Sequence, residues 1–288
     1  MSSKKWWTLP ALSLLAACGG GDHSDGVVSL QRPSEYVLRW SDEFNQANLS
    51  SDWTYDTGAT LLGGSVWGNN EKQYYRPQNA TLVDGKLVIQ PAAISPGGDI
   101  TQQEITAKGL LATSARVKTD TPAYYAALNQ KPYGFYEIRA QIPCVAGAWP
   151  AIWMLGRDGD WPARGEVDIM EWFGALFAGT QQVQAAVHTA NRYGVTALNH
   201  KKTIEGVCTG YHNFQLHWTP QVMVMGVDGT EIFRYVKPAG AGQADWPFDQ
   251  PAHLILNVAV GGNLGGQVDV NQLPNMTLRV DWIKVWQP

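Results

Sequence analysis

The chain has 288 residues, 44% of them hydrophobic and 16% charged, and a formal net charge of −4 at pH 7. This acidic balance argues against polyanions such as nucleic acid as partners. The length allows one large domain with a sizeable core, or two smaller domains. Because no linker rich in Pro, Gly or Ser interrupts the chain after residue 30, we predict a single domain.

The first 17 residues have the basic start and short apolar run of a secretory signal. The run is too short to span a membrane permanently. It ends in Leu-Ala-Ala-Cys, which resembles a bacterial lipobox, so we expect Cys18 to be lipidated and to become the new N-terminus. Gly19, and not Asp, follows Cys18, and by the bacterial sorting pattern this favours the outer membrane. The lipid would then be the only membrane attachment. The alternative is an ordinary cleaved signal and a secreted protein.

Residues 18–35 are predicted as a flexible tether, since they begin with glycines and small polar residues. Past residue 36, short β-branched and aromatic runs alternate with Gly, Pro, Asn and Asp, as at residues 86–89, 134–139 and 222–227. Asp-Gly pairs at residues 84–85 and 228–229 predict hairpin turns. Long helical periodicity is absent, so we predict an all-β fold, a two-sheet sandwich or a barrel. Residues 119–131 are predicted as an inserted loop.

Besides Cys18, the chain contains two cysteines, Cys144 and Cys208. In an oxidising compartment a disulfide between them is plausible. Two unpaired buried thiols are the alternative, because the sequence does not show whether the two Cα atoms come within bridging distance.

Three carboxylates, Glu166, Asp168 and Glu171, stand within six residues and alternate with apolar side chains. On a strand, Glu166 and Asp168 share a face, whereas the odd spacing turns Glu171 the other way. One β-bulge between Asp168 and Glu171 would bring all three to one face and leave Val167 and Ile169 in the core. Because neighbouring like charges destabilise a sheet, this crowding indicates catalysis.

The Glu-x-Asp-x-x-Glu motif, with Trp-Pro-Ala-Arg-Gly before it, resembles the active-site strand of glycoside hydrolase family 16, in particular its laminarinase-like endo-β-1,3-glucanases. Further motifs of the family follow in its order from about residue 37 to the C-terminus. These are Trp-Ser-Asp-Glu-Phe (40–44), Trp-Gly-Asn-Asn-Glu (67–71), Ala-Trp-Pro-Ala-Ile-Trp-Met-Leu (148–155), Leu-Asn-Val-Ala-Val-Gly-Gly-Asn (256–263) and Val-Asp-Trp-Ile-Lys-Val-Trp (280–286).

The resemblance implies a two-sheet β-jelly roll over residues 36–288, with a concave substrate cleft. It also implies a retaining endo-hydrolase of β-1,3-glucan, with Glu166 as nucleophile and Glu171 as general acid/base. Asp168, as an anion between them, would raise the pKa of Glu171. A transglycosylase, or a relative acting on another β-glucan or galactan, would share these residues. The acid triplet and the tryptophans would also be compatible with a glycan-binding lipoprotein without activity, or with a carboxylate-bound metal enzyme.

Substrate-binding residues follow from the same resemblance. Trp149, Trp153 and Trp161 would be sugar platforms and His188 would lie near the acid/base, although each could instead be packed in the core. Asn69 and Arg116 are further candidates for contacts with sugar hydroxyls. The partner is then a polysaccharide, and the protein is expected to act as a monomer.

No metal-ligand spacing such as His-Glu-x-x-His occurs, so we expect no cofactor for catalysis. Many family members hold one structural calcium. Here Asp281 would be its acid, with carbonyls near Glu43 and Gly85. Asp281 as an ordinary hydrogen-bonded strand residue is the alternative.

Overall fold

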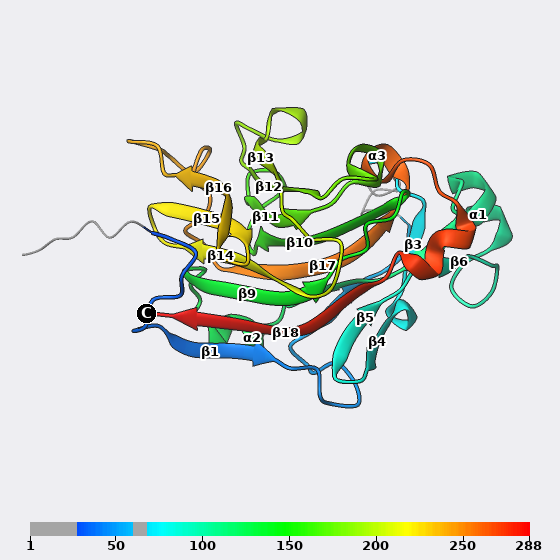
Figure 1. Cartoon of the computed structure of the whole chain (residues 1–288), viewed down its shortest axis with the longest axis horizontal. Coiled ribbons are helices and arrows are strands. Elements are labelled where there is room, and N and C mark those ends of the chain that lie inside the picture. The colour runs from blue at the N-terminus through cyan, green and yellow to red at the C-terminus, as the bar shows by residue number, and fades with distance from the viewer. Residues whose placement is uncertain (1–27, 60–67) are drawn as a thin grey trace, which may run out of the picture.

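The computed structural model describes residues 28–59 and 68–288. Two large antiparallel sheets stack face to face, and a small third sheet lies at one end (Figure 1). This arrangement confirms the all-β sandwich expected from the short runs and turn signals. The predicted lipidation site, Cys18, lies outside the described residues.

Sheet A has the strand order β16-β15-β14-β9-β18-β5-β4, and β1 pairs with β18. Its strands are β1 (Val37–Asp42), β4 (Ala80–Val83), β5 (Lys86–Ile89), β9 (Gly134–Gln141), β14 (His212–Trp218), β15 (Val222–Val227), β16 (Thr230–Val236) and β18 (Leu278–Gln287). Both predicted hairpin turns are present. Asp84 and Gly85 join β4 to β5, and Asp228 and Gly229 join β15 to β16, each with positive φ at both residues.

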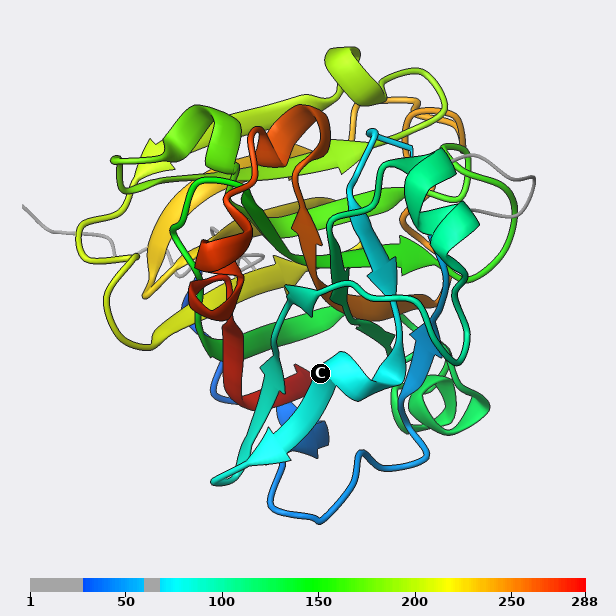
Figure 2. The same cartoon turned by 90° about the vertical axis from the view of Figure 1, so that its right-hand side faces the viewer.

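Sheet B has the order β13-β12-β11-β10-β17-β8-β2. Its strands are β2 (Thr54–Asp56), β8 (Arg116–Lys118), β10 (Ala148–Gly156), β11 (Glu166–Glu171), β12 (Gln182–His188), β13 (Leu198–Thr203) and β17 (Ala252–Val260). The small sheet consists of β3 (Gln73–Tyr75), β6 (Ala92–Ala93) and β7 (Ala112–Ser114). Figure 2 looks onto the end of the sandwich at which this small sheet and α1 lie.

The helices are short and lie in the connections. They are α1 (Gln102–Lys108), α2 (Pro122–Ala127), α3 (Gly174–Phe177), α4 (Gly262–Gly265) and the 3₁₀ turns η1 (Pro77–Asn79), η2 (Gly194–Thr196) and η3 (Val270–Asn275). The inserted segment 119–131 was expected as a loop, but it contains α2. Thr121 caps this helix by accepting from the Tyr124 amide, and Pro122 follows in the first turn. Tyr124 is buried against Trp40 of β1, which fixes the helix to the domain.

The core lies between the two sheets. Alternate residues of β10 and β17, such as Ile152 and Leu256, face similar residues of sheet A, such as Ile138 and Leu216, and all four are fully buried. The residues between them on β10 and β17 therefore turn to the other face of sheet B. That outer face carries the polar residues of the candidate active site.

Cross-strand register defines one row of side chains on the outer face of sheet B. Residues directly opposite each other in antiparallel strands lie on the same face. The pairs run from the edge strand β2 to the middle of the sheet and beyond, through Asp56, Arg116, Asn257, Ala151, Glu171 and Gln184.

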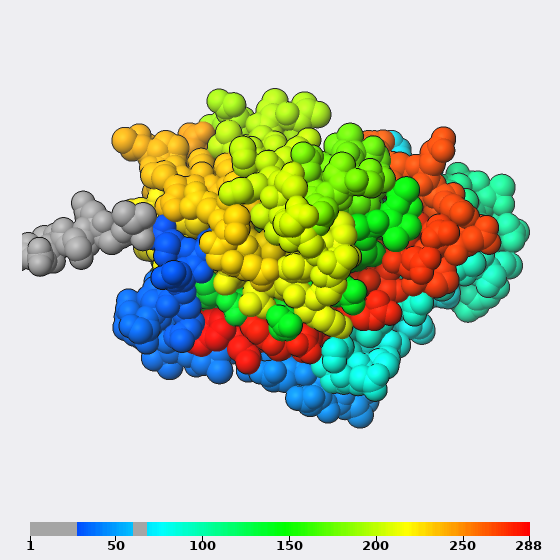
Figure 3. All heavy atoms as spheres, viewed as in Figure 1, coloured from blue at the N-terminus to red at the C-terminus, as the bar shows by residue number. Residues whose placement is uncertain are grey.

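Residues 28–35 belong to the predicted flexible tether, but they are packed onto sheet A. Leu30 is buried against Val222 and Val224, whose side chains point away from the core between the sheets. Its side chain occupies the space beside Gly226, where a Cβ would come within 2.4 Å of Leu30. Figure 3 shows this blue segment lying against the yellow strands at one end of the molecule. The domain therefore begins at residue 28 or earlier.

Cys144 and Cys208 are joined by a disulfide, with their Cα atoms 5.5 Å apart. The bond connects the β9–β10 connection to the segment between β13 and β14. Among the described residues, no helix has the length and apolar character needed to cross a membrane.

Candidate active site

A β-bulge in β11 brings the three carboxylates together. Asp168 lies opposite Ala186 of β12 and Glu171 opposite Gln184, so three steps along β11 match two along β12. The extra residue lets both Ile169 and Met170 enter the core, where they are fully buried. The bulge predicted from the spacing is therefore present, and it turns Glu171 to the face that Asp168 occupies.

His188 of β12 lies against two of the three acids. Its Nε2 is 3.2 Å from Asp168 Oδ2 and 3.8 Å from Glu166 Oε1. The Gly194 amide donates to Nδ1 over 3.2 Å, so in the neutral ring the proton is on Nε2 and faces Asp168. The imidazole thus turns its N–H edge towards both carboxylates, although Asp168 Oδ2 has no hydrogen-bond partner within standard geometry among the described residues.

Each of the two glutamates accepts a hydrogen bond from the N–H of a tryptophan indole. Trp161 Nε1 donates to Glu166 Oε2 over 2.6 Å, and Trp149 Nε1 donates to Glu171 Oε1 over 3.1 Å. Trp149 is buried, whereas Trp161 is 48% exposed, so only Trp161 offers much ring surface to a ligand. The two tryptophans orient the carboxyls as well as lining the site.

Gln184 was not anticipated from the sequence. Its Nε2 donates to Glu171 Oε2 over 3.4 Å, so both oxygens of this carboxyl have a donor. Gln184 precedes His188 by four residues on β12 and so shares its face. The spacing of four residues to His188 was the signal in the sequence that could have indicated Gln184. Its contact with Glu171 could be inferred only with knowledge that β12 pairs with β11.

Burial and mutual repulsion raise the pKa values of the triplet. The pKa of Glu171 is raised well above its ordinary value, first by burial and then by the charges of Asp168 and Glu166. Burial and Asp168 also raise the pKa of Glu166, while His188 and Trp161 lower it. Burial raises the pKa of Asp168, and its hydrogen bond with Glu166 opposes the rise. The three groups titrate together, and Glu171 is the one that best retains a proton.

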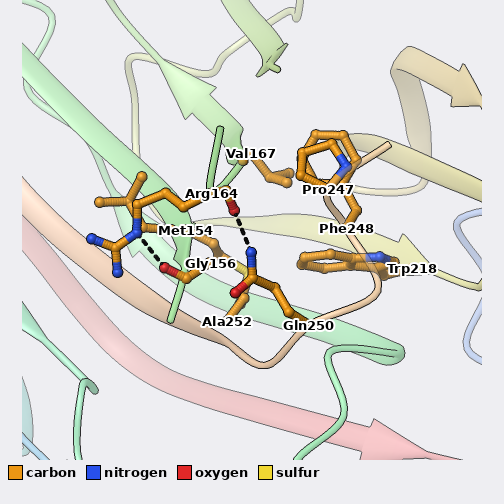
Figure 4. Close-up of a pocket in the computed structure, with 11 residues that line it drawn as sticks. Met154, Gly156, Arg164, Val167, Trp218, Pro247, Phe248, Gln250 and Ala252 are labelled. Carbon is orange, nitrogen blue, oxygen red and sulfur yellow. Dashed lines mark hydrogen bonds between the residues drawn. The ribbon is translucent and has the colours of Figure 1, made fainter. Parts of the chain in front are cut away.

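Trp161 lies in the connection between β10 and β11. Gln250 hydrogen-bonds to the backbone at both ends of this connection. Gln250 Nε2 donates to the Arg164 carbonyl over 2.9 Å, and the Asp158 amide donates to Gln250 Oε1 over 2.8 Å. Arg164 Nε in turn donates to the Gly156 carbonyl (Figure 4). Gly156 is required here, because a Cβ would lie 2.0 Å from the Arg164 carbonyl oxygen.

Trp153 and Arg116 form a second group, towards the edge of sheet B. The Arg116 guanidinium lies 4.5 Å from the centroid of the Trp153 ring. Trp153 Nε1 donates to Asn257 Oδ1 over 2.7 Å, so this indole does not bind a catalytic carboxyl. Asn69 lies at the buried Glu71 carboxyl, to which it hydrogen-bonds.

Comparison with known proteins gives the family. Residues 99–284 match the model of the glycosyl hydrolases family 16. A relative, the beta-glucanase of Rhodothermus marinus, is 36% identical over 296 residues, which cover 96% of this chain and 92% of the relative.

The chain belongs to glycosyl hydrolase family 16. Solved structures of the family have the same fold. The laminarinase from Flavobacterium sp. UMI-01 is 32% identical, with a TM-score of 0.74 over 87% of this chain and 100% of that one. SCLam, a non-specific endo-beta-1,3(4)-glucanase, is 36% identical, with a TM-score of 0.76 over 90% and 94%. Two further curated relatives are longer, and the chain spans about a third of their length.

As a family 16 member the protein is a glycoside hydrolase, which needs no cofactor for catalysis. One group of potential metal ligands occurs in the described part of the chain, formed by Glu166, Asp168 and His188, whose ligand atoms lie within 4.8 Å of one another. The proton on Nε2 of His188 faces that group, and a metal would have to displace it. The chemistry of these donors therefore does not suit a resident metal.

The acid of the predicted calcium site, Asp281, lies on β18 of sheet A and already has two cationic neighbours. Arg139 Nε is 3.2 Å and Lys86 Nζ 3.7 Å from the Asp281 carboxylate. A calcium ion at this carboxylate would compete with both side chains. The calcium site, with Asp281 as its acid and carbonyls near Glu43 and Gly85, stays a prediction from the resemblance.

Proposed function

We propose that this protein is a retaining endo-hydrolase of β-1,3-glucan, in which Glu166 is the nucleophile and Glu171 the general acid/base. The observation that carries the proposal is the bulge in β11, which places two indole-bonded glutamates on one face with Asp168 between them. Two carboxyls presented by one short strand suit the close pair of a retaining enzyme better than the wider pair of an inverting one.

The two glutamates have surroundings that fit different roles. Glu171 has the most strongly raised pKa, so it enters the reaction protonated and can give its proton to the leaving glycosidic oxygen. Glu166 accepts a hydrogen bond from Trp161 and faces the Nε2 proton of His188, and both stabilise its anion. An anion there can attack the anomeric carbon as the bond to the leaving oxygen breaks.

The glycosyl ester formed on Glu166 removes one negative charge from the triplet. The pKa of Glu171 then falls, because a charge that had raised it is gone. Glu171, now an anion, takes a proton from water, and the water oxygen attacks the anomeric carbon and releases Glu166. Asp168 holds the Glu166 rotamer through their hydrogen bond, and His188 Nε2 lies 3.8 Å from Glu166 Oε1.

The choice of β-1,3-glucan rests on the relatives. The similar proteins are a beta-glucanase, a laminarinase and a non-specific endo-beta-1,3(4)-glucanase. Trp161, and Trp153 with Arg116 stacked on its ring, would support the pyranose rings of such a chain. Asn69 is a further candidate for contacts with sugar hydroxyls.

Proton NMR during the first minutes of laminarin digestion tests mechanism and substrate together. New reducing ends should appear as the β-anomer before mutarotation. An α-anomer as the first product would reject the retaining mechanism. Inactivity on laminarin with activity on a galactan would reject only the substrate, and transfer of glycosyl units to added acceptor oligosaccharide in preference to water would indicate a transglycosylase.

We also propose that the protein is a lipoprotein of the bacterial cell envelope, attached through Cys18. The support is the lipobox pattern of the sequence. Replacing Cys18 by Ala removes the atom that would carry the lipid, and should release the protein from the membrane fraction or block its maturation. Unchanged membrane fractionation of that variant would exclude the proposal.

A further inference from the structure

Exposed apolar side chains lie on the two connections next to the catalytic carboxyls. Trp161 and Tyr193 are about half exposed, at 48% and 47%, and Val195, two residues after Tyr193, is fully exposed. The rings of Trp161 and Tyr193 meet nearly at right angles, with centroids 5.5 Å apart. We call these three side chains the ledge. Grouped exposed apolar residues of this kind mark binding surfaces more often than single ones do.

The backbone that carries Tyr193 and Val195 is well held. Tyr193 N donates to Thr196 Oγ1, and Thr196 Oγ1 donates back to the Tyr193 carbonyl, which closes the turn η2. Asn191 Nδ2 donates to Asp245 Oδ1 over 2.8 Å, which ties the loop to the segment before β17. Little further ordering of the ledge is therefore needed when a ligand binds to it.

The ledge is continuous with the catalytic residues. Trp161 donates to Glu166, and its ring centroid lies 6.1 Å from that of His188. On the other side, the amide of Gly194, between Tyr193 and Val195, donates to Nδ1 of His188. A sugar unit held at Glu166 thus has the ledge as the next surface in that direction.

We propose that Tyr193 and Val195 form a further sugar-binding subsite, which holds a neutral pyranose unit of the same glucan chain beyond the unit at Glu166. This rests on the proposed function. The exposed part of the Tyr193 ring can stack on the C–H face of a pyranose, and the fully exposed side chain of Val195, two residues further along the turn, is available for apolar contact with the same chain. The phenol hydroxyl can exchange hydrogen bonds with sugar hydroxyls.

Initial rates on β-1,3-gluco-oligosaccharides of increasing length test the subsite. Tyr193→Ala should raise KM about two- to tenfold for chains long enough to reach the ledge, because the contact between the aromatic ring and the sugar is lost. The shortest cleaved chains should show a much smaller change. Tyr193→Phe should keep most of the affinity, because the ring remains. Val195→Ser should raise KM about twofold for long chains.

Val83→Ser is the control for Val195→Ser, because Val83 is an exposed valine that lies on β4 of sheet A. Equal losses on short and long chains in Tyr193→Ala would overturn the subsite and indicate that Tyr193 only supports Trp161. No loss on either would overturn it too. If the wild type cleaves a different β-glycan, the proposed function fails, and the same length series made from that glycan decides the subsite separately.

Discussion

Asp56 and Glu171 occupy the same cross-strand row on the outer face of sheet B, yet their surroundings differ. Asp56, at the edge, lies 3.0 Å from Arg116 Nε and 2.9 Å from Lys118 Nζ. Glu171, on the central strand, has two other carboxylates nearby and only neutral donors within hydrogen-bonding distance. In the part of the chain that the structure describes, no lysine or arginine forms an ion pair with the triplet.

This difference shows how one sheet can carry structural and reactive acids. A carboxylate that forms ion pairs with two cations, like Asp56, links neighbouring strands. A carboxylate crowded by others, with few cations near it, can hold a proton near neutral pH and release it when the local charge changes. Substitutions that remove the charge of Asp56, or of one acid of the triplet, should therefore distinguish a structural carboxylate from a catalytic one.

The largest effect is expected for Glu166→Gln. The amide cannot attack as an anion, so kcat should fall on the order of a thousandfold or more while the fold and oligosaccharide binding persist. Asp56→Asn, the matched change in the ion-paired acid, should lower kcat far less. Steady-state kinetics on laminarin and circular dichroism of both variants measure this. Retention of more than a few per cent of activity by Glu166→Gln would rule out its assignment as nucleophile.

Glu171→Ala should affect substrates according to their leaving groups. Hydrolysis of glucan, whose leaving oxygen needs a proton, should slow by about 10² to 10⁴. Aryl glycosides with acidic phenols should be affected much less, because their leaving oxygen hardly needs protonation. The ratio of the two kcat/KM values measures this, and equal losses would exclude Glu171 as the general acid.

Asp168→Asn should move the basic limb of the pH–rate profile to lower pH. Glu171 must be protonated for the first step, so activity is lost as the pH rises through its pKa. The Asp168 charge raises that pKa, after burial, and the variant lacks the charge. Profiles of kcat/KM for the wild type and the variant measure the shift. An unmoved basic limb would count against this coupling.

Gln250→Ala should lower kcat about tenfold without contacting the substrate. It leaves the Arg164 carbonyl and the Asp158 amide without their shared partner and loosens the connection that holds Trp161 against Glu166. KM for short oligosaccharides should change less than kcat. Gln272→Ala, on η3 far along the chain from this connection, is the control. A loss of thermal stability with kcat intact would show that Gln250 is only structural.

Calcium removal is expected to have the smallest effect. Two cationic side chains already face Asp281, so EDTA should shift the midpoint of thermal unfolding by less than about 1 °C. Differential scanning fluorimetry with EDTA and with added calcium measures this. A rise of several degrees on adding calcium would show that the ion displaces Lys86 and Arg139.

Local signals predicted the parts of the site that lie on one strand. The spacing of Glu166, Asp168 and Glu171 required a bulge, and the structure contains one. Gln184, Gln250 and Tyr193 were missed, because each depends on which strands pair and on how a connection folds back. The helix α2 was missed as well, although Thr121 and Pro122 form a recognisable start signal.

The N-terminal segment was also mispredicted, because its packing depends on residues that are distant in the sequence. Leu30 and Val28 are two apolar residues in a short segment without periodicity, and their site at Val222 and Val224 lies almost 200 residues away in the sequence. No local pattern distinguishes such an anchored residue from one in a free linker. Only the folded sheet creates the surface on which it is buried.

The position of that segment has a consequence for orientation. Val222 and Val224 turn outward from sheet A, and the carboxyl triplet turns outward from sheet B, so Leu30 and the triplet lie on opposite faces of the sandwich. Ten residue-to-residue steps separate Cys18 from Val28, so the chain between them can reach at most about 35 Å. With a lipid on Cys18, this segment would hold sheet A towards the bilayer. The carboxyl triplet on sheet B would then face away from the membrane, where a long polysaccharide can approach it.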